Sequence, residues 1–419
     1  MKIAHVMNRF PSISETFILS QITGLIDRGH SVEIYARTAD QTVVHGDVLR
    51  YRLDECTHYV QRESDTMPEA LPDRLRAAWR IGRAHSGRRQ AALIGSLDPF
   101  RCGREAMSLR ALFRVARFAE GGLAEADIVH CHFGPSGIEG ALLKAAGLMR
   151  APLITTFYGY DVTSFVKQQG IAVYRRLFEH CDAVLAISQL MVRQLKALGC
   201  PANKLVLQPV SVKIRDGEAA PSVRLASANG HRRLLTVARL VEKKGAEYAI
   251  RAVAALLARY PEIEYNIVGD GPLRAQLEGL IRELEAEQKI RILGYMPQAE
   301  MANYMAQADV LVVPSITAAD GDQEGTPTVV IEALGRGLPI VATRHSAIPE
   351  LVEDGITGYL VPERDVMAMS GRIEFLIQHP AAWPRLAEAG RAKYAAHFDP
   401  DLLNDRLEAL YKRLLARYM

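Results

Sequence analysis

The sequence is poor in cysteine and in long apolar runs. Its five cysteines are scattered and never form a C-x-x-C pair; they are Cys56, Cys102, Cys131, Cys181 and Cys200. This pattern argues against a disulfide framework and a structural zinc site, and it favours a reducing compartment. No stretch reaches the roughly 18 apolar residues of a membrane span, and Met1–Phe10 has no apolar core of signal-peptide length. We therefore expect a cytoplasmic protein.

Net charge gives little guidance to a partner, since 51 basic and 48 acidic residues leave a formal charge of +3. The distribution is uneven, however. The segment from Arg74 to Arg117 holds eleven arginines and, as acidic residues, Asp98 and Glu105, with apolar residues between them. It predicts either a pair of surface helices with solvated polar faces or a basic amphipathic surface that rests on anionic lipid at the inner face of the plasma membrane. No nucleic-acid motif accompanies it, so we expect no nucleic-acid partner.

Short β-branched runs alternate with longer helical patterns in both halves of the chain, which is typical of βαβ units and a parallel sheet. In the first half, strands are predicted at Ile3–Met7, Val32–Ala36, Ile128–His132, Leu153–Phe157, Ala183–Ile187 and Leu205–Val210. In the second half they are predicted at Leu234–Ala238, Tyr265–Val268, Arg291–Leu293, Val310–Val313, Ile340–Ala342 and Tyr359–Val361. Helices are predicted at Glu15–Arg28, Ala246–Arg259, Leu273–Glu287 and Leu402–Tyr418.

A turn-rich stretch from Lys213 to Arg232 separates the halves and indicates a linker. We predict an α/β protein with two Rossmann-like, doubly wound parallel-sheet domains that face an interdomain cleft. The domains span residues 1–212 and 213–395, and residues 396–419 form a helix that returns to the first domain. In such sheets ligands bind beyond the carboxyl ends of the strands.

The segment from Pro314 to Glu350 carries the most informative pattern. Glu324 and Glu332 are separated by seven residues, among them Gly325, Thr326, Pro327 and Thr328. We predict that Pro327 lies in the first turn of a helix that runs from Thr328 to about Leu334 and ends at Gly335 and Gly337. The amides of residues 325 to 329 would then form an anion site suited to a diphosphate. The two glutamates could accept hydroxyl hydrogen bonds on either side of it, although a chance pair of exposed glutamates is the alternative.

Two further loops follow predicted strands of the second half. Arg239 and Lys244 leave the strand that ends near Ala238, on the side where cations can neutralise a diphosphate leaving group. Gly269 lies in the turn Val268-Gly269-Asp270-Gly271-Pro272, a pattern that marks a tight strand-to-helix turn more often than a ligand contact.

Three loops of the first half also follow predicted strands. The first contains Ser14, Glu15 and Thr16, which could cap the next helix. The second follows His130 and His132, and the third contains Tyr158 and Asp161. A histidine near a strand end is more often a hydrogen-bonded structural residue than a catalyst, and His132 is the stronger functional candidate of the two.

These motifs together resemble the large retaining GT-B glycosyltransferases of the family 4 type. The resemblance rests on E-G-T-P-T-V-V-I-E at 324–332, R-L-V-E-K-K-G at 239–245, V-G-D-G-P at 268–272 and I-P-E-L-V-E-D-G at 348–355, in matching order. More narrowly, F-P-S-I-S-E-T-F-I at 10–18, H-C-H-F-G at 130–134 and H-S-A-I-P-E at 345–350 are similar to bacterial exopolysaccharide transferases of the colanic-acid type.

The resemblance implies a role for each matching residue. Arg239 and Lys244 would bind the diphosphate, Glu332 the ribose and Glu324 the donor sugar. The backbone at Gly325–Thr328 and Gly269 would contact the nucleotide sugar, with Tyr295 and Met296 near the base. The first domain would bind the acceptor through Ser14, Glu15, Thr16, His132, Tyr158 and Asp161. Transfer would retain the anomeric configuration without a metal ion or another cofactor, and Glu324, His132, Arg239 and Lys244 would be the catalytic groups.

The chain departs from this family pattern in two places. Tyr158-Gly159-Tyr160-Asp161 stands where relatives often have H-G-x-D, and a tyrosine of ordinary pKa near 10 cannot act as a base at neutral pH. His345-Ser346-Ala347 replaces a common glycine pair. In addition, Asp320-Gly321-Asp322 matches the D-x-D of metal-dependent transferases of another fold; because it precedes the predicted anion site, we interpret it as no metal site.

The predicted function is transfer of a hexose from a UDP- or GDP-sugar to a lipid-linked or growing polysaccharide. A nucleotide-sugar 2-epimerase on the same architecture is the principal alternative. A dinucleotide-dependent oxidoreductase is disfavoured because no G-x-G-x-x-G follows the first strand of either half. A non-catalytic sugar-nucleotide binding module is disfavoured because every expected donor-site residue is present.

Overall fold

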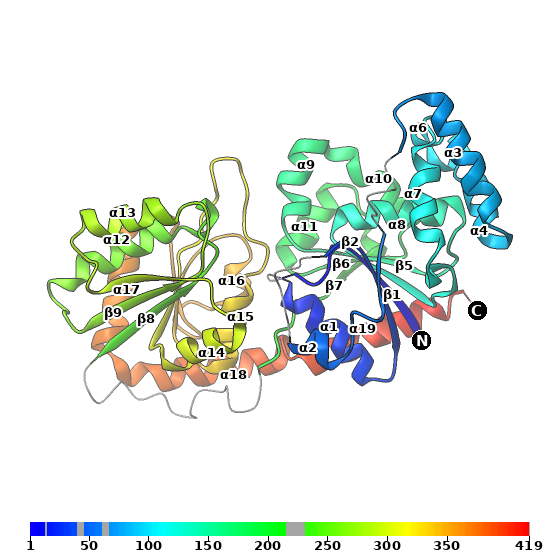
Figure 1. The fold of residues 1–419 in the computed structure, drawn as a ribbon. Helices are drawn as coiled ribbons and strands as arrows, with labels where there is room; N and C mark the ends of the chain where they lie inside the picture. Colours follow the sequence, from blue (N-terminus) through cyan, green and yellow to red (C-terminus); the bar gives the residue numbers. More distant parts are fainter. Residues whose placement is uncertain (13–14, 40–45, 61–66, 215–230, 419) are drawn as a thin grey trace. The chain divides into compact units, whose positions relative to one another are not determined.

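The computed structural model describes residues 1–12, 15–39, 46–60, 67–214 and 231–418, apart from the side chains of residues 298 and 299. Contacts between Cα atoms divide the chain into two units (Figure 1). Unit 1 comprises Met1–Ile187, Met191–Gln208 and Pro400–Met419, and unit 2 comprises Ser188–Leu190 and Pro209–Asp399.

Unit 1 is built on a parallel sheet in the order β3-β2-β1-β4-β5-β6-β7. Its strands are β1 (Lys2–Arg9), β2 (Ser31–Thr38), β3 (Thr57–Tyr59), β4 (Ile128–His132), β5 (Leu153–Phe157), β6 (Ala183–Ala186) and β7 (Leu205–Leu207). Its α-helices are α1 (Thr16–Asp27), α2 (Gly46–Arg50), α3 (Leu71–Ala84), α4 (Gly87–Gly95), α5 (Pro99–Cys102), α6 (Arg104–Met107), α7 (Arg110–Ala119), α8 (Gly134–Ala146), α9 (Ser164–Gln169), α10 (Arg175–His180), α11 (Gln189–Ala197) and α19 (Pro400–Leu415). Short 3-10 turns are η2 (Gly122–Glu125), η3 (Tyr160–Val162), η4 (Ile171–Tyr174) and η5 (Ala202–Lys204).

Unit 2 repeats this plan with a parallel sheet in the order β10-β9-β8-β11-β12-β13. Its strands are β8 (Arg232–Val237), β9 (Ile263–Val268), β10 (Ile290–Gly294), β11 (Val310–Val313), β12 (Ile340–Thr343) and β13 (Tyr359–Val361). Its helices are α12 (Ala246–Leu257), α13 (Arg274–Glu283), α14 (Gln298–Gln307), α15 (Thr328–Arg336), α16 (Ile348–Leu351), α17 (Val366–Gln378) and α18 (Trp383–His397), with the 3-10 turns η6 (Glu242–Lys244) and η7 (Pro380–Ala382).

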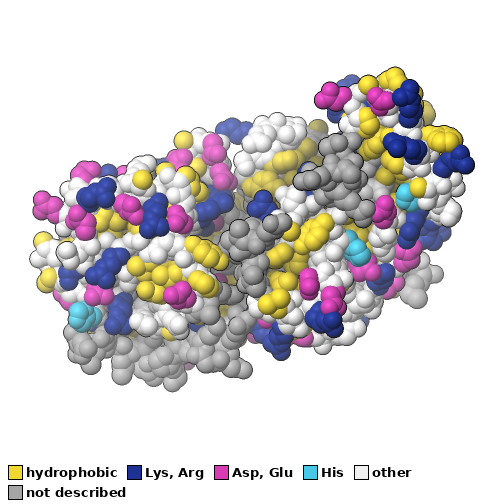
Figure 2. Space-filling model, viewed as in Figure 1, with side chains coloured by type: hydrophobic (Ala, Val, Ile, Leu, Met, Phe, Trp, Pro, Cys, Tyr) yellow, Lys and Arg dark blue, Asp and Glu magenta, His cyan; other side chains and the backbone are white. Residues whose placement is uncertain are grey.

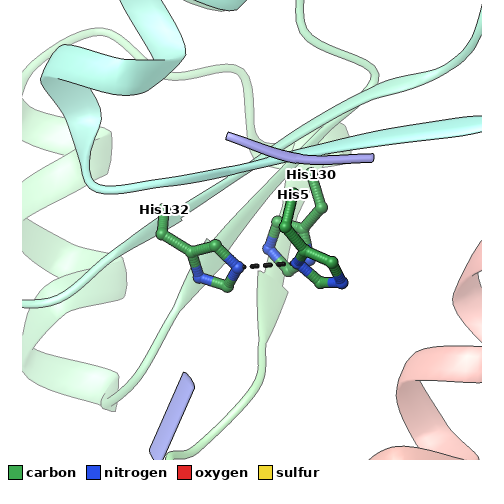
Figure 3. Close-up of side chains that lie close together, drawn as sticks. All are labelled: His5, His130 and His132. Carbon is green, nitrogen blue, oxygen red and sulfur yellow. Dashed lines mark hydrogen bonds between the residues drawn. The ribbon is translucent and has the colours of Figure 1, made fainter. Parts of the chain in front are cut away.

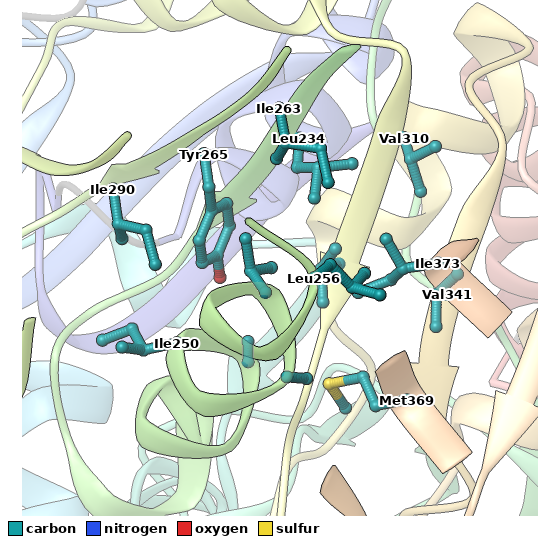
Figure 4. Close-up of a cluster of buried hydrophobic side chains, with 14 of the residues drawn as sticks. Leu234, Ile250, Leu256, Ile263, Tyr265, Ile290, Val310, Val341, Met369 and Ile373 are labelled. Atoms are coloured by element: carbon teal, nitrogen blue, oxygen red, sulfur yellow. The ribbon is translucent and has the colours of Figure 1, made fainter. Parts of the chain in front are cut away.

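Each unit buries its sheet under helices. In unit 1, α1 and the C-terminal helix α19 pack together, and Ile18, Leu407 and Tyr411 join the buried strand residues Ile3 and Ile34 in one apolar cluster. In unit 2, apolar residues of the sheet and of α12, α13 and α17 form the corresponding core (Figure 4). The Tyr265 hydroxyl is buried in that core and hydrogen-bonds Thr236 Oγ1 at 2.7 Å, which compensates its loss of water.

The two parallel α/β sheets confirm the predicted fold class. Each predicted strand overlaps an observed one, but β3 was missed, because three edge residues show no alternation of apolar and polar side chains. Both sheets reverse their strand order beside a central strand, between β1 and β4 in unit 1 and between β8 and β11 in unit 2. The crevice at the carboxyl ends of such a strand pair is where doubly wound sheets generally bind their ligands.

Two predictions for α15 were wrong in detail. Pro327 is the residue that precedes the helix rather than part of its first turn, and Gly335 lies inside the helix instead of ending it. A Cβ at Gly335 would lie 2.1 Å from Ile214 Cδ1 and 3.0 Å from the Tyr394 ring, so this glycine serves close packing. Gly337, with φ of 63°, terminates the helix in the left-handed conformation.

A pair of surface helices was one of the two interpretations of the arginine-rich segment, residues 74–117; the segment instead belongs to five helices, α3 to α7. The breaks occur at residues that interrupt a helix, since Gly87 and Gly103 have φ near 60° and Pro99 opens α5. Most of the predicted linker, Lys213–Arg232, lies outside the described residues. Within the described part of the chain, no helix has the length and apolar character needed to cross a bilayer.

Candidate functional site

In unit 2, two loops meet where β8 and β11 end. A Cβ at Gly245 would lie 2.0 Å from the carbonyl oxygen of Pro314, so only glycine permits this approach of the loop after β8 to the segment after β11. Gly245 also has φ of 62°, which glycine adopts without strain. The contact brings the lysines of η6 to the loop that precedes α15.

Lys244 and Glu324 form an ion pair at this point, with 2.6 Å between Nζ and Oε1. The neighbouring Lys243 binds Asp322 at 2.9 Å and the carbonyl oxygen of Gln323 at 3.3 Å. Glu324 is only 8% exposed. Burial would raise the pKa of its carboxyl group, but the Lys244 ammonium in contact with it, helped by Lys243 and His345, holds the pKa below its ordinary value. The site thus keeps a buried carboxylate ionised beside a cation.

The backbone of Glu324 is held by two residues of the H-S-A-I-P-E motif that were assigned no role from the sequence. His345 is fully buried; its Nε2 accepts a hydrogen bond from the Glu324 amide at 3.1 Å, and its Nδ1 lies 2.6 Å from the Glu363 carboxylate. Ser346 donates its hydroxyl to the Glu324 carbonyl oxygen at 2.7 Å, from a backbone with φ of 46°. Glu363 itself had no signal in the sequence.

The other residues predicted to contact the donor lie around this pair. Arg239 is exposed between β8 and η6, and its side chain makes no hydrogen bond or ion pair within the described residues. Gly269 follows β9, and a Cβ there would lie 1.9 Å from the Ala238 carbonyl oxygen. Tyr295, 59% exposed, follows β10 and precedes the half-buried Met296.

The loop and helix of the predicted anion site carry the remaining donor residues. Gly325 and Thr326 precede Pro327, Thr328 is the first residue of α15, and Glu332 is buried within that helix. The Thr326 hydroxyl is buried and has no hydrogen-bond partner among the described residues. Because most buried hydroxyls in proteins are hydrogen-bonded, this one is suited to contact a bound ligand.

The acidic residues of the D-x-D pattern have contacts within their own surroundings. Asp320 Oδ1 accepts a hydrogen bond from the Asp322 amide, while Asp322 Oδ2 pairs with Lys243. This arrangement engages one oxygen of each carboxylate with the protein.

In unit 1, the predicted residues His132 and Tyr158 form a buried polar chain with His5 of β1, which the sequence had not marked. His132 has no exposed surface; its Nδ1 lies 2.7 Å from the Tyr158 hydroxyl and its Nε2 lies 2.9 Å from His5 Nδ1 (Figure 3). Burial lowers the pKa of His132 well below its ordinary value, so the ring is neutral at neutral pH. Burial also raises the pKa of Tyr158 well above its ordinary value.

Among the described residues of unit 1, His5, His130 and His132 form a group that could hold a metal ion, since their ligand atoms lie within 4.8 Å of one another. His130, however, binds Thr156 Oγ1 at 2.7 Å and the Tyr411 hydroxyl at 2.6 Å. Among the nitrogens of these three described rings, His5 Nε2 is the one without a hydrogen-bond partner. The geometry therefore fits neutral imidazoles, with His5 hydrogen-bonded to His132 and His130 hydrogen-bonded to Thr156 and Tyr411.

The remaining acceptor-site predictions have different outcomes. Ser14 lies outside the described residues. Glu15 immediately precedes α1 and Thr16 begins it, but the Glu15 side chain does not cap the helix, so that capping prediction was wrong for Glu15. Burial raises the pKa of the Glu15 carboxyl to about 7, against a smaller opposing effect of Arg9.

Asp161 is fully buried, and its carboxylate accepts hydrogen bonds from the amides of Gly134, Tyr158 and Gly159. Burial raises its pKa to about 6, and these amides oppose the shift. The carboxylate therefore connects the start of α8 to the loop after β5.

Comparison with known proteins identifies the class to which this fold and these loops belong. The model of the "Glycosyl transferase 4-like domain" family matches residues 14–210, and that of "Glycosyl transferases group 1" matches residues 222–393. WcaL of Salmonella typhimurium, assigned to colanic acid biosynthesis as a glycosyltransferase, is 35% identical over 99% of this chain and 100% of its own length. The amylovoran biosynthesis glycosyltransferase AmsK of Erwinia amylovora is 34% identical, with the same coverage. The chain therefore belongs to this glycosyltransferase family, among the bacterial exopolysaccharide biosynthesis glycosyltransferases.

A solved structure shares the fold. The crystal structure of HepE from Anabaena in complex with UDP matches with a TM-score of 0.72 and 17% sequence identity, over 99% of this chain and 100% of that chain. This likeness agrees with the GT-B architecture that the two parallel sheets define.

Proposed function

We propose that the protein transfers a hexose, with retention of the anomeric configuration and without a metal ion, from a UDP- or GDP-sugar to a lipid-linked or growing polysaccharide. The observation that carries this proposal is the Lys244–Glu324 pair at the strand-order reversal of unit 2, directly before α15. A cation and a helix N-terminus at one point favour a diphosphate, and the adjacent ionised carboxylate favours sugar hydroxyls. The UDP bound to HepE supports a nucleotide donor here.

The proposed donor site assigns a function to each neighbour of this pair. Arg239 and Lys244 bind the diphosphate, and the Thr326 hydroxyl and the backbone of residues 325–328 add contacts to it. Glu332 binds the ribose, the backbone of Gly269 contacts the nucleotide, and Tyr295 and Met296 lie beside the base. Asp322 stays with Lys243, which leaves the D-x-D pattern without a metal-binding role.

In the proposed reaction, the acceptor oxygen attacks the anomeric carbon from the side that the diphosphate leaves. The bond between that carbon and the phosphate oxygen breaks, the new glycosidic bond forms, and the leaving diphosphate takes the acceptor proton. Arg239 and Lys244 stabilise the negative charge that develops on the diphosphate. Glu324 orients the sugar.

In unit 1, Glu15, Thr16 and Tyr158 are the proposed acceptor contacts. His132 acts as a positioning residue in this proposal, because it is enclosed and reaches the acceptor side through the Tyr158 hydroxyl. Asp161 holds the Tyr158–Gly159 backbone in place.

The donor assignment is tested by thermal stabilisation with UDP, GDP, ADP and their sugars, since a ligand that binds only the folded state raises the unfolding temperature. We expect one uridine or guanosine diphosphate to stabilise the wild type and to fail with the Arg239→Ala and Lys244→Ala variants. Equal stabilisation of wild type and variants would refute the assignment.

Incubation with the donor alone separates the proposal from the epimerase alternative. A transferase hydrolyses its donor slowly, whereas a 2-epimerase makes a new nucleotide sugar. NMR of the transferred anomeric centre tests retention, and loss of activity in a chelator with recovery in manganese would overturn metal independence.

We also propose that the protein works at the cytoplasmic face of an anionic membrane through the arginine-rich segment. Apolar side chains on α3 to α6 are exposed among the arginines; Trp79 is 63% and Phe100 97% exposed. Figure 2 shows apolar and basic side chains together over α3 and α4. Apolar side chains that enter a lipid surface beside cations are typical of peripheral membrane proteins.

Sedimentation with vesicles that contain anionic lipid tests this surface. We expect binding that falls with salt and weakens about tenfold in a Trp79→Ser/Phe100→Ser variant. A Met367→Ser variant, which removes an exposed apolar residue of unit 2, is the matched control. Equal binding to neutral vesicles would contradict the proposal.

A further inference from the structure

Glu324 lies on a loop, residues 314–327, that joins β11 to α15 and contains neither helix nor strand. A carboxylate on such a segment orients a sugar only when its backbone is held in one position, because loops are otherwise the more mobile parts of a protein. Two further strands of unit 2 end on the same side as β11. Since β12 lies next to β11 and β13 lies next to β12, residues that follow these strands can reach the loop.

The first part of the loop is bound by residues that follow β13. Glu363 Oε2 accepts a hydrogen bond from the Thr317 amide at 2.8 Å, and Glu363 Oε1 accepts one from the Thr317 hydroxyl at 3.4 Å. The next residue, Arg364, donates a guanidinium N–H to the Thr317 carbonyl oxygen. Both backbone polar groups of Thr317 are therefore bound by the segment after β13.

The same Glu363 carboxylate acts on the last part of the loop through His345. The Glu324 amide can only donate a hydrogen bond, so His345 Nε2, which accepts it at 3.1 Å, carries no proton. The single proton of the ring is then on Nδ1, which donates to Glu363 Oε1 at 2.6 Å. Because the ring has no exposed surface, bulk water does not compete for either bond. One carboxylate thus holds Thr317 directly and Glu324 through the imidazole.

Glu363 is suited to this double contact because it stays ionised. Burial would raise the pKa of its carboxyl group, but the bonds from the Thr317 amide and from His345 hold the pKa below its ordinary value. An ionised carboxylate offers two acceptor oxygens, and here one binds the Thr317 amide and the other binds His345. A carboxamide in this place would offer one acceptor oxygen only.

These contacts hold the backbone of Glu324 and leave its carboxylate available. The Glu324 amide is bound by His345, the carbonyl oxygen by Ser346 and the carboxylate by Lys244. Lys244, the proposed diphosphate contact, belongs to the loop after β8, to which the described contacts of Glu363 do not extend. Loss of the Glu363 contacts should therefore disturb the sugar end of the donor more than the nucleotide end.

We propose that Glu363 is a positioning residue for the donor sugar and acts through His345 on the backbone of Glu324. The inference rests on the proposed function, in which Glu324 orients the sugar. A misplacement of about 1 Å near the reacting atoms can cost about 100-fold in rate, which is a physical reason to hold this carboxylate rigidly. Glu363 itself contacts no substrate in this proposal, so its effect appears in how the sugar is held.

The test compares nucleotide sugars with the corresponding nucleotides on the full-length protein. Titration calorimetry gives dissociation constants for UDP-glucose and UDP, and for GDP-mannose and GDP, and the pair that binds the wild type is used. In Glu363→Gln we expect the ratio of the nucleotide-sugar constant to the nucleotide constant to rise about tenfold, as for the loss of one hydrogen bond to a charged group. Affinity for the nucleotide alone should stay within about twofold of the wild type.

Glu374→Gln is the matched control. Glu374 lies on α17, is enclosed to a similar degree as Glu363, and also binds two partners, Arg259 and Tyr260, outside the proposed donor site. Urea unfolding of both variants measures the loss of stability, and the ratio of the two constants should rise in Glu363→Gln alone. A rise in both variants, or in neither, would overturn the inference.

A double-variant cycle tests the route through His345. His345→Gln places an amide oxygen near the position of Nε2 and can still accept from the Glu324 amide, whereas His345→Leu cannot. We expect the ratio to stay close to the wild-type value in His345→Gln, to rise in His345→Leu, and to rise no further when Glu363→Gln is added to His345→Leu. Additive effects, or equal ratios in His345→Gln and His345→Leu, would contradict the proposal that Glu363 acts through this ring.

The same measurements separate this inference from the proposed function. A wild type that binds none of these nucleotides would refute the donor site and, with it, the role of Glu363. Nucleotide binding with an unchanged ratio in Glu363→Gln would refute the role of Glu363 and leave the donor site intact.

Discussion

The two units place their candidate sites at the same point of the same topology and stabilise them by opposite means. In unit 2 the loops after β8 and β11 are held by ion pairs, Lys244 with Glu324 and Lys243 with Asp322. In unit 1 the ends of β4 and β5 are held by the neutral chain of His5, His132 and Tyr158.

The difference appears in the acid groups. Contact with a cation lowers the pKa of Glu324 against the effect of burial, whereas burial dominates in unit 1 and raises the pKa of Glu15 to about 7 and of Asp161 to about 6. The same topology thus supports two kinds of site. In unit 2 the carboxylate stays charged at neutral pH, whereas in unit 1 the carboxyl groups gain or lose a proton near neutral pH.

Breaking the ion pair of unit 2 should have the largest effect. Lys244→Ala removes the proposed diphosphate contact, and we expect the transfer rate to fall about 10²–10³-fold. It also leaves Glu324 buried without its cation, so unit 2 should lose stability. Initial rates at saturating donor and urea unfolding measure the two effects. Lys393→Ala, which removes a similarly enclosed lysine from its pair with the exposed Glu353, is the control, and comparable losses in both variants would refute the special role of Lys244.

The second largest effect is expected on the pH dependence of stability, through the Glu15 carboxyl group of unit 1. The pKa of Glu15 lies near 7 in the folded protein and near 4.5 when unfolded, so the folded state holds a proton that the unfolded state has lost. Its contribution to stability therefore falls as pH rises from about 4.5 to about 7. Relative to the wild type, Glu15→Gln should gain about 2–3 kcal/mol in free energy of unfolding between about pH 5 and pH 8.

Urea unfolding of the wild type and Glu15→Gln at both pH values tests this prediction. Both proteins contain the same buried histidines, whose titration changes stability in the opposite direction. The difference between the two free energies of unfolding therefore cancels the contribution of the histidines. Glu69→Gln, an exposed glutamate, is the control. Parallel pH dependence of the wild type and Glu15→Gln would show that Glu15 titrates normally.

A smaller loss is expected at His345, which holds the backbone of the charged site. His345→Ala removes the acceptor for the Glu324 amide and the partner of Glu363, and leaves polar groups unsatisfied in a buried place. We expect a loss of about 2 kcal/mol in the free energy of unfolding and a lower affinity for the donor. His379→Ala, at an exposed residue directly after α17, should cost less than about 0.5 kcal/mol. Unchanged donor affinity in His345→Ala would separate His345 from the site.

The smallest loss of stability is expected at Tyr158, in the neutral site of unit 1. Tyr158→Phe deletes the hydroxyl that pairs with His132 Nδ1, and should cost about 1 kcal/mol of stability. If Tyr158 contacts the acceptor, KM for the acceptor rises while stabilisation by the nucleotide stays unchanged. Tyr160→Phe is the adjacent control for stability. A change in nucleotide affinity would contradict the separation of the two sites.

Sequence patterns were sufficient for the fold class, because runs such as Val310–Val313 and Ile340–Thr343 are almost wholly apolar, as strands buried on both faces of a sheet are. Sequence patterns also located α15, which starts at Thr328 as predicted and ends at Gly337. Sequence patterns gave a wrong result where tertiary contacts select the residue. Gly335 was predicted to end the helix, but it lies inside the helix and is required by the close approach of Ile214 and Tyr394.

Local sequence by itself determined the two parallel sheets and the positions of Lys244, Glu324 and Tyr158 near strand or helix ends, because periodicity and turn residues act over a few neighbouring residues. The hydrogen-bond partners of these residues could be identified from the tertiary structure alone. His5 meets His132 because β1 lies beside β4, and His345 reaches Glu324 because β12 lies beside β11. These contacts join residues far apart in the chain, and their stability comes from burial that no local pattern specifies.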